Sequence, residues 1–174
     1  MGKVIISDID GVVANFFDAA RRYCSEHFYK ELPPDWLENT LTSEELHVLV
    51  HDKDLFSELD VYPYVKSSFR QLKNRGYEIC LVSKRKLTKD VTLGWLLKNK
   101  IPFDKFHTYS DKDRIKLAKI EKPLAFIEDN FATALSVSKF VKYSFLVDHP
   151  WNRYPHPDVV RVDTLEDIFF YLEQ

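Results

Sequence analysis

The chain has 174 residues, of which 45% are hydrophobic and 30% charged, and its formal net charge is −2. This length and composition are typical of one globular domain with room for a modest insertion. The near-neutral charge argues against binding of long nucleic acid or of a membrane through a basic surface. No apolar run approaches the ~18 residues of a membrane-spanning helix, and the N-terminus turns acidic too early for a signal peptide. Cys24 and Cys80 share no CxxC spacing, so we expect reduced thiols and a cytoplasmic protein.

The N-terminal third of the chain predicts one strand followed by helices. In order, the predicted elements are a short buried strand at residues 3–7, a helix over 15–27, a break at Pro33 and Pro34, and a helix over 42–51 that opens at Thr42 or Ser43. No strand is predicted between residues 15 and 62. We therefore interpret residues 15–62 as a small helical cap, inserted after the first strand of a core formed by residues 1–14 and 63–174.

Beyond the cap, helices and strands alternate. Helices are predicted over residues 62–76, 89–100, 111–122, 131–140 and 164–173, and strands at residues 77–82, 124–130 and 143–148. This alternation indicates an α/β fold with a mainly parallel sheet. Ligands of such sheets bind outside the carboxyl ends of the strands.

Polar side chains fall at several of these strand ends. They are Asp8 and Asp10, Ser83, and Glu128 with Asp129. Each has an ordinary structural interpretation: Asp-Gly pairs make turns, and Asp129, Asn130 or Ser83 would cap a helix. A calcium loop counted from Asp8 is excluded, because Val12 and Val13 stand where a ligand and a glycine are needed. The coincidence at several strand ends favours a site for Mg²⁺ and phosphate instead.

Four segments match in order the motifs of haloacid dehalogenase-like (HAD) phosphohydrolases: DIDGVVANF, LVSKR, the lysine in SDKDR, and FIEDN. The sequence resembles this superfamily over about residues 3–150. Within that superfamily, DGVVANF, DLFSELDVYPYV and VDHPWNR resemble the 5′(3′)-deoxyribonucleotidase-like branch, the cytosolic type C 5′-nucleotidases. The resemblance implies a Rossmann-like core and a Mg²⁺-dependent phosphomonoester hydrolase. Its substrates would be small phosphorylated molecules, above all (deoxy)ribonucleoside monophosphates. A phosphatase for sugar phosphates or for nucleic-acid 3′ ends, and a non-catalytic phosphate-binding module, remain as alternatives.

The resemblance also implies roles for the acids. Asp8 would attack phosphorus and form an aspartyl-phosphate, and Asp10 would act as general acid and base. Alternation along a strand would place both on one side, provided the extended conformation continues through Asp10. Mg²⁺ would bind the carboxylates of Asp8 and Asp129 and the backbone carbonyl of Asp10. Glu128 replaces the aspartate that often stands at its position, so we expect it to act indirectly or through water.

Phosphate would be bound by the Ser83 hydroxyl, the Lys84 backbone N–H and a lysine at a helix start. Lys112 is favoured for that lysine because it lies nearest the expected helix N-terminus, with Lys116 and Lys119 as competitors.

Aromatic residues of the cap are candidates for contact with a nucleobase. The resemblance implies this contact for Phe16, which falls where the branch places an aromatic residue against the nucleobase. Phe56 and Trp36 are the other candidates; packing in the core explains Phe16 equally well, and it explains Phe56 and Trp36 better. His149 and Trp151 lie in a loop beside the same edge and are expected to shape the site. A homodimer is left open.

Overall fold

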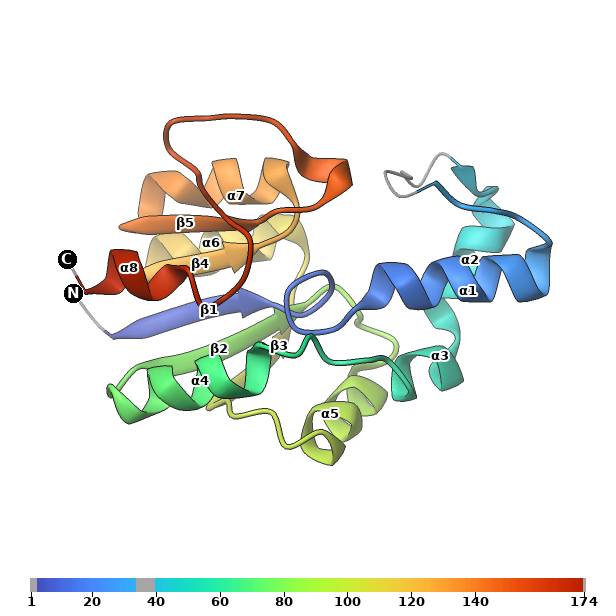
Figure 1. The fold of residues 1–174 in the computed structure, drawn as a ribbon, viewed down its shortest axis with the longest axis horizontal. Helices are drawn as coiled ribbons and strands as arrows, with labels where there is room; N and C mark the ends of the chain where they lie inside the picture. The colour runs from blue at the N-terminus through green and yellow to red at the C-terminus, as the bar shows by residue number, and fades with distance from the viewer. Residues whose placement is uncertain (1–2, 34–39, 174) are drawn as a thin grey trace.

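Six parallel strands form the sheet at the centre of the molecule, in the order β3-β2-β1-β4-β5-β6 (Figure 1). The structure is a computed structural model that describes residues 3–33 and 40–173. The strands are β1 (Val4–Asp8), β2 (Glu78–Ser83), β3 (Lys105–Thr108), β4 (Ala125–Glu128), β5 (Tyr143–Val147) and β6 (Val160–Val162). The α/β fold with a parallel sheet is therefore confirmed, and β1 lies between β2 and β4.

Helices cover both faces of this sheet. They are α4 (Val65–Asn74), α5 (Lys89–Lys98), α6 (Asp111–Glu121), α7 (Phe131–Val137) and α8 (Ile168–Leu172). Successive residues of a strand point to opposite faces. Ile5 of β1 accordingly joins the core cluster that contains α4, α5 and α8. Ile6 joins the cluster on the other face, which contains residues of α6 and α7.

Three elements were not predicted from the sequence. They are the edge strands β3 and β6 and the short helix α3 (Lys53–Ser57). The edge strands have four and three residues, too short for a periodic pattern to be visible. The C-terminal helix is also shorter than expected and begins at Ile168.

The segment expected to form the cap contains α1 (Phe16–Phe28), α2 (Ser43–His51) and α3, which lie beyond the carboxyl end of β1 (Figure 1). It has a small core of its own, made of Ala20, Cys24, Leu32, Leu41 and Leu49. Phe16 and Leu55 also pack against the main core. Trp36 lies outside the described residues.

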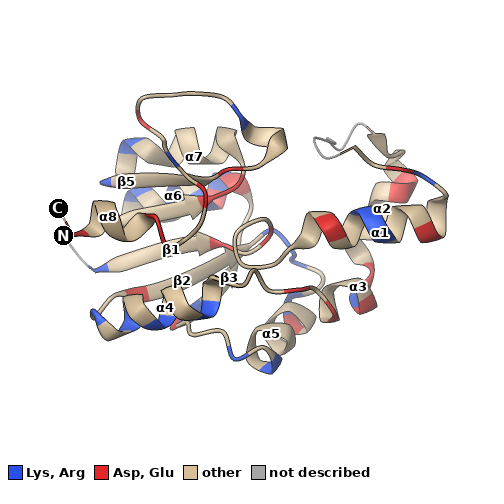
Figure 2. Cartoon of the chain, in the orientation of Figure 1, with Lys and Arg blue, Asp and Glu red and all other residues tan. Residues whose placement is uncertain are grey.

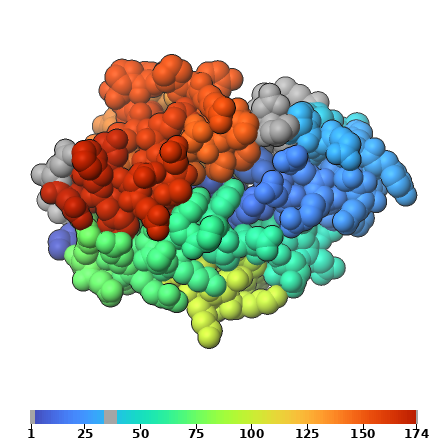
Figure 3. Space-filling view, in the orientation of Figure 1, coloured from blue at the N-terminus to red at the C-terminus, as the bar shows by residue number. Residues whose placement is uncertain are grey.

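The cap packs on α5 and on the loop after β5, besides its contacts with the main core. On α5, the indole of Trp95 donates a hydrogen bond of 2.8 Å to the Leu59 carbonyl. At the loop after β5, the rings of Phe17 and Trp151 have centroids 3.7 Å apart. In the space-filling view, the blue N-terminal part of the chain adjoins the orange part (Figure 3). The cap is thereby held against the core from both sides.

The surface carries both signs of charge. Helix α1 carries residues of both signs, whereas the charged residues of α4 are all lysine or arginine (Figure 2). Over the described part of the chain, no helix is both long and apolar enough to cross a membrane.

Candidate active site

The turn after β1 carries the first two acids. The strand ends at Asp8, and the chain bends at Ile9, whose carbonyl accepts hydrogen bonds of 2.8 Å from the N–H groups of Val13 and Ala14. The prediction that both acids share one side of the strand assumed that the extended conformation continues through Asp10. The structure shows that it does not. Asp8 and Asp10 nevertheless line the same cavity, because the bend turns Asp10 towards it.

Gly11 allows the neighbouring strand end to approach this turn. Its φ is +75°, and a Cβ atom placed on it would lie 2.4 Å from the Asp129 Oδ2 atom. No other residue type accommodates both the backbone conformation and this contact without strain. The glycine thus brings the carboxylate of Asp129 against the end of β1.

Asp8, Glu128 and Asp129 form a cluster of buried carboxylates, each of which offers one oxygen atom that lies within 4.8 Å of those of the other two. Burial, together with the charge of Asp8, raises the pKa of Asp129 to about 8 and that of Glu128 well above its usual range. Such a cluster binds protons or cations readily, because either relieves the repulsion between its charges.

The cation beside this cluster is Arg114, which sequence reasoning missed. Its Nη2 lies 2.8 Å from Asp8 Oδ1 and its Nη1 2.5 Å from Glu128 Oε1. Burial opposes its charge, but the carboxylates of Asp8 and Glu128 raise the pKa of Arg114, so the guanidinium remains charged. Arginine suits this position because it presents two donors to two separate carboxylates.

The register of α6 selects Arg114 over the expected lysine. Ser110 caps this helix in a capping box with Asp113, and Arg114 and Ala118, four residues apart, point inward. Lys112 is exposed, as are Lys116 and Lys119. The structure therefore brings none of the three lysines to Asp8, and the spacing of Arg114 from Ala118 was the signal in the sequence that could have found it.

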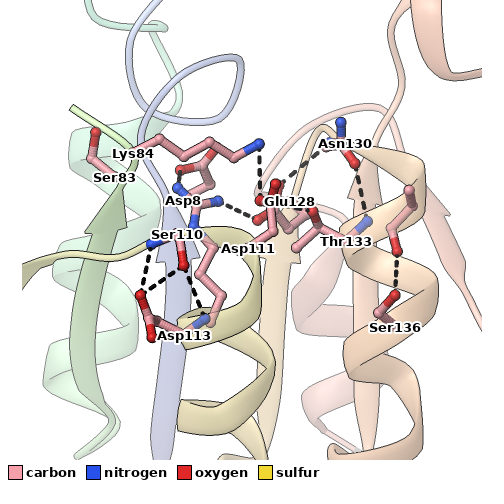
Figure 4. Close-up of polar contacts among 12 residues, drawn as sticks. Asp8, Ser83, Lys84, Ser110, Asp111, Asp113, Glu128, Asn130, Thr133 and Ser136 are labelled. Carbon is pink, nitrogen blue, oxygen red and sulfur yellow. Dashed lines mark hydrogen bonds and ion pairs between the residues drawn. The ribbon is translucent and has the colours of Figure 1, made fainter. Parts of the chain in front are cut away.

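The loop after β2 places Ser83 and Lys84 differently from each other. Ser83 is fully buried, its Oγ accepts a 3.1 Å hydrogen bond from the Arg85 N–H, and it does not line the cavity itself. Lys84 lines the cavity, and its Nζ lies 2.9 Å from the Asp111 carboxylate (Figure 4).

Asp10 is paired with Arg85, a second residue that sequence reasoning missed. The Arg85 Nε donates to Asp10 Oδ2 at 2.9 Å, and its Nη2 donates to Oδ1. Arg85 itself is buried, with its guanidinium 4.0 Å from the ring centroid of Phe56. No periodic pattern distinguishes this arginine from its neighbours in the loop.

A cavity of about 910 Å³ lies between the cap and the core, with the acids at its base. Phe16 lines it, whereas Phe56, which also borders it, is 2% exposed and has Arg85 over its ring. Phe17, Leu46 and Val50 add an apolar wall from the cap. The volume is within the range of small-molecule sites.

The loop after β5 closes one side of the cavity. The Trp151 Nε1 donates to Asp129 Oδ2 at 3.2 Å, and Asn152 donates to the Asp129 backbone carbonyl at 2.6 Å. His149 stacks on Trp151, with ring centroids 4.2 Å apart, and its Nε2 lies 2.7 Å from the Gly11 carbonyl oxygen. This loop therefore orients Asp129.

Comparison with known proteins gives one family and one common fold. A family model described as "5' nucleotidase, deoxy (Pyrimidine), cytosolic type C protein" matches residues 2–171. A Chlorobaculum tepidum protein named "Putative 5'(3')-deoxyribonucleotidase" is 29% identical over 119 residues, 58% of this chain, and the match spans only 59% of that relative.

Two solved structures illustrate the fold. A phosphoserine phosphatase in apo form aligns over 98% of this chain and 99% of its own, with a TM-score of 0.65 and 18% identity. CbbY from Rhodobacter sphaeroides, solved in complex with phosphate, aligns over 97% and 96% of the two chains, with a TM-score of 0.65 and 14% identity. At these identities the likeness shows that the chain has the fold of the HAD superfamily.

Proposed function

We propose that this chain is a phosphomonoester hydrolase of (deoxy)ribonucleoside monophosphates. The chain belongs to the family described as "5' nucleotidase, deoxy (Pyrimidine), cytosolic type C protein". The observation that carries the proposal is the position of Asp8. It ends a central strand at the base of the cavity, contacts Arg114, and lies beside two further buried carboxylates.

The reaction would proceed in two steps through Asp8. Its carboxylate oxygen attacks phosphorus, the bond from phosphorus to the ester oxygen breaks, and Asp10 gives the departing alkoxide a proton. Asp10 then takes a proton from water, which attacks phosphorus and releases inorganic phosphate, so that the Asp8 carboxylate is restored. Both acids line the cavity in which the substrate would lie.

The residues at the base of the cavity fit Mg²⁺. When all three are ionised, Asp8, Glu128 and Asp129 set three negative charges against the one positive charge of Arg114. Burial raises the pKa of Glu128 and Asp129, so a bound cation would take the place of the protons that these groups otherwise hold. Carboxylate oxygens are the ligands that this ion prefers. Asp8 and Asp129 would hold it, with the Asp10 carbonyl as the third expected ligand, although Asp8 as well as Glu128 contacts Arg114. When bound, the ion would neutralise the repulsion between Asp8 and the phosphate.

The phosphate would lie between the Lys84 loop and Arg114. We assign to Arg114 the positive charge that was expected from Lys112, because Arg114 contacts the carboxylate of Asp8. Lys84 offers its backbone N–H and a side chain that already reaches into the cavity. Ser83 would have to turn its hydroxyl hydrogen towards the phosphate, since its oxygen accepts from Arg85.

The leaving group would occupy the wall formed by the cap. Phe16 and Phe17 offer aromatic rings there, and Leu46 and Val50 offer apolar surface, which suits a flat nucleobase. Phe56 is covered by Arg85, so we assign it to support of that arginine and leave the base contact to Phe16 and its neighbours. The buried free thiols of Cys24 and Cys80 accord with a cytoplasmic location, which is part of this proposal.

A phosphate-release assay over nucleoside 5′- and 3′-monophosphates and sugar phosphates, with and without Mg²⁺, tests the proposal. We expect hydrolysis of nucleotides that EDTA abolishes and Mg²⁺ restores. The Asp8→Asn variant should remain folded by circular dichroism and lose turnover. Turnover in that variant would contradict the aspartyl-phosphate mechanism, and activity on sugar phosphates alone would replace the nucleotidase by a sugar-phosphate phosphatase.

A further inference from the structure

Arg85 is buried in the wall of the cavity and holds Asp10 with two of its nitrogen atoms. The side chain is 5% exposed, and Nε and Nη2 donate to the two different oxygens of the Asp10 carboxylate. A paired guanidinium of this kind fixes both the position and the plane of a carboxylate. Asp10 is 26% exposed, so one side of it still faces the cavity.

Arg85 is itself held from two further directions. Its backbone N–H donates to Ser83 Oγ at 3.1 Å, which ties it to the loop proposed to bind phosphate. Its guanidinium lies 4.0 Å from the ring centroid of Phe56 and 5.9 Å from that of Phe16. Arg85 therefore contacts the loop proposed to bind phosphate, the carboxylate of Asp10 and the aromatic rings of the cap at the same time.

This arrangement is costly if it serves only to stabilise the fold. Nη1 of Arg85 is buried and has no hydrogen-bond partner among the described residues. An unpaired buried donor on a charged group destabilises a protein, and an apolar side chain of similar volume would fill the same space without that penalty. An arginine at this position is explained if its charge and its paired donors serve the site.

We propose that Arg85 is a positioning residue for Asp10, one that aims this carboxyl group at the ester oxygen of the substrate. The proposal rests on the proposed function, since it takes Asp10 as the acid that protonates the leaving group. A general acid must lie within hydrogen-bond reach of the atom it protonates, and a carboxyl group free to rotate loses much of its effect.

The chemistry of the leaving group separates positioning from a structural role. The alkoxide of a nucleoside is strongly basic and needs a proton as it departs, whereas p-nitrophenolate is a weak base that departs without one. The value of kcat/KM reports the steps up to formation of the aspartyl-phosphate, so the later attack of water does not enter. A residue that acts through Asp10 therefore affects hydrolysis of a nucleotide far more than hydrolysis of p-nitrophenyl phosphate.

The test compares Arg85→Met, Arg85→Lys and Asp10→Asn with the wild type on both esters. General acid catalysis contributes about 10²–10⁴-fold, so Asp10→Asn should lose that much on the nucleotide and little on the aryl phosphate. Arg85→Met should lose at least about tenfold on the nucleotide and less than about threefold on the aryl phosphate, and Arg85→Lys should recover part of the loss. Because both esters are measured on one sample, the ratio of the two rates is independent of the fraction of folded protein.

Arg75→Met is the matched control, since Arg75 pairs with Glu173 outside the cavity. Its ratio should equal that of the wild type. Equal losses on both esters in Arg85→Met would show a structural role and overturn the proposal, as would a gain on the nucleotide. A wild type that hydrolyses neither ester would instead overturn the proposed function, and the role of Arg85 with it.

Discussion

Replacing Arg114 by methionine tests the electrostatic design of the site. The variant keeps most of the side-chain volume but removes the guanidinium that lies between Asp8 and Glu128. Loss of one partner from a buried ion pair costs about 3–5 kcal/mol. The carboxylates can recover some of this by binding protons, since burial already raises the pKa values of Glu128 and Asp129. We therefore expect the lower end, about 3 kcal/mol, which for a chain of this size lowers Tm by roughly 6–12 °C.

Thermal unfolding in EDTA, followed by titration with Mg²⁺, measures this effect. The ion should raise the Tm of Arg114→Met by more than that of the wild type, because it would then be the only positive charge among the three carboxylates. Turnover should fall at least about 10²-fold, since a fixed charge beside the phosphate is lost. Arg114→Lys should recover part of the stability, because one ammonium replaces two separate donors.

Lys112→Met provides the comparison on the same helix. Lys112 is exposed, so we expect its loss to change the free energy of unfolding by no more than about 0.5 kcal/mol and to leave most of the turnover. If Lys112→Met destabilises or inactivates the protein more than Arg114→Met does, the reasoning that assigns the cation to Arg114 is refuted.

Two further substitutions test other parts of the structure. Gly11→Ala should lower Tm and weaken Mg²⁺ binding measured by calorimetry. The positive φ of this residue costs alanine about 1–2 kcal/mol, and the added Cβ would displace Asp129. Gly94→Ala is the control: Gly94 lies in open space on α5, so the substitution should stabilise the protein by about 0.5–1 kcal/mol. Unchanged Mg²⁺ affinity in Gly11→Ala would contradict the crowding argument. Asp104→Asn should cost about 1 kcal/mol at pH 7. Burial raises the pKa of Asp104, but the Lys73 ammonium and a backbone N–H of β2 together lower it below its usual value. The stabilisation is therefore complete above pH ~4 and is lost as the pH falls below it, so the difference in Tm between the variant and the wild type should shrink in acid. A difference independent of pH would refute this account.

The interior of the fold was predictable from the sequence, and its edges were not. A central strand such as β1 begins with three consecutive apolar residues, and the helical stripe of α4 is followed by Gly76, which has a φ of +79°. The edge strands β3 and β6 are short and only partly buried, so their residues carry no comparable pattern. Their strand conformation is determined by hydrogen bonding to β2 and β5, which the local sequence does not reveal.

The acids of the site could be placed from the sequence because parallel strands end at one edge, but their partners could not. Asp8 and Asp129 follow from the topology alone. The pairing of Asp10 with Arg85 depends on a bend at Ile9 and on a loop conformation, and neither is periodic. The identity of the buried cation depends on the register of α6, and the four-residue spacing of Arg114 from Ala118 indicates that register.

Two departures from the motifs that the sequence resembles turn out to be in contact. Glutamate stands at 128 where aspartate is frequent, and an arginine at 114 takes the place expected for lysine; Nη1 of Arg114 lies 2.5 Å from Glu128 Oε1. The extra methylene of Glu128 carries its carboxylate towards Arg114, whose second nitrogen still reaches Asp8. The two changes therefore compensate each other: the balance of charge in the group stays the same, the longer side chain of Glu128 reaches one nitrogen of Arg114, and Asp8 gives the cation a single oxygen, Oδ1.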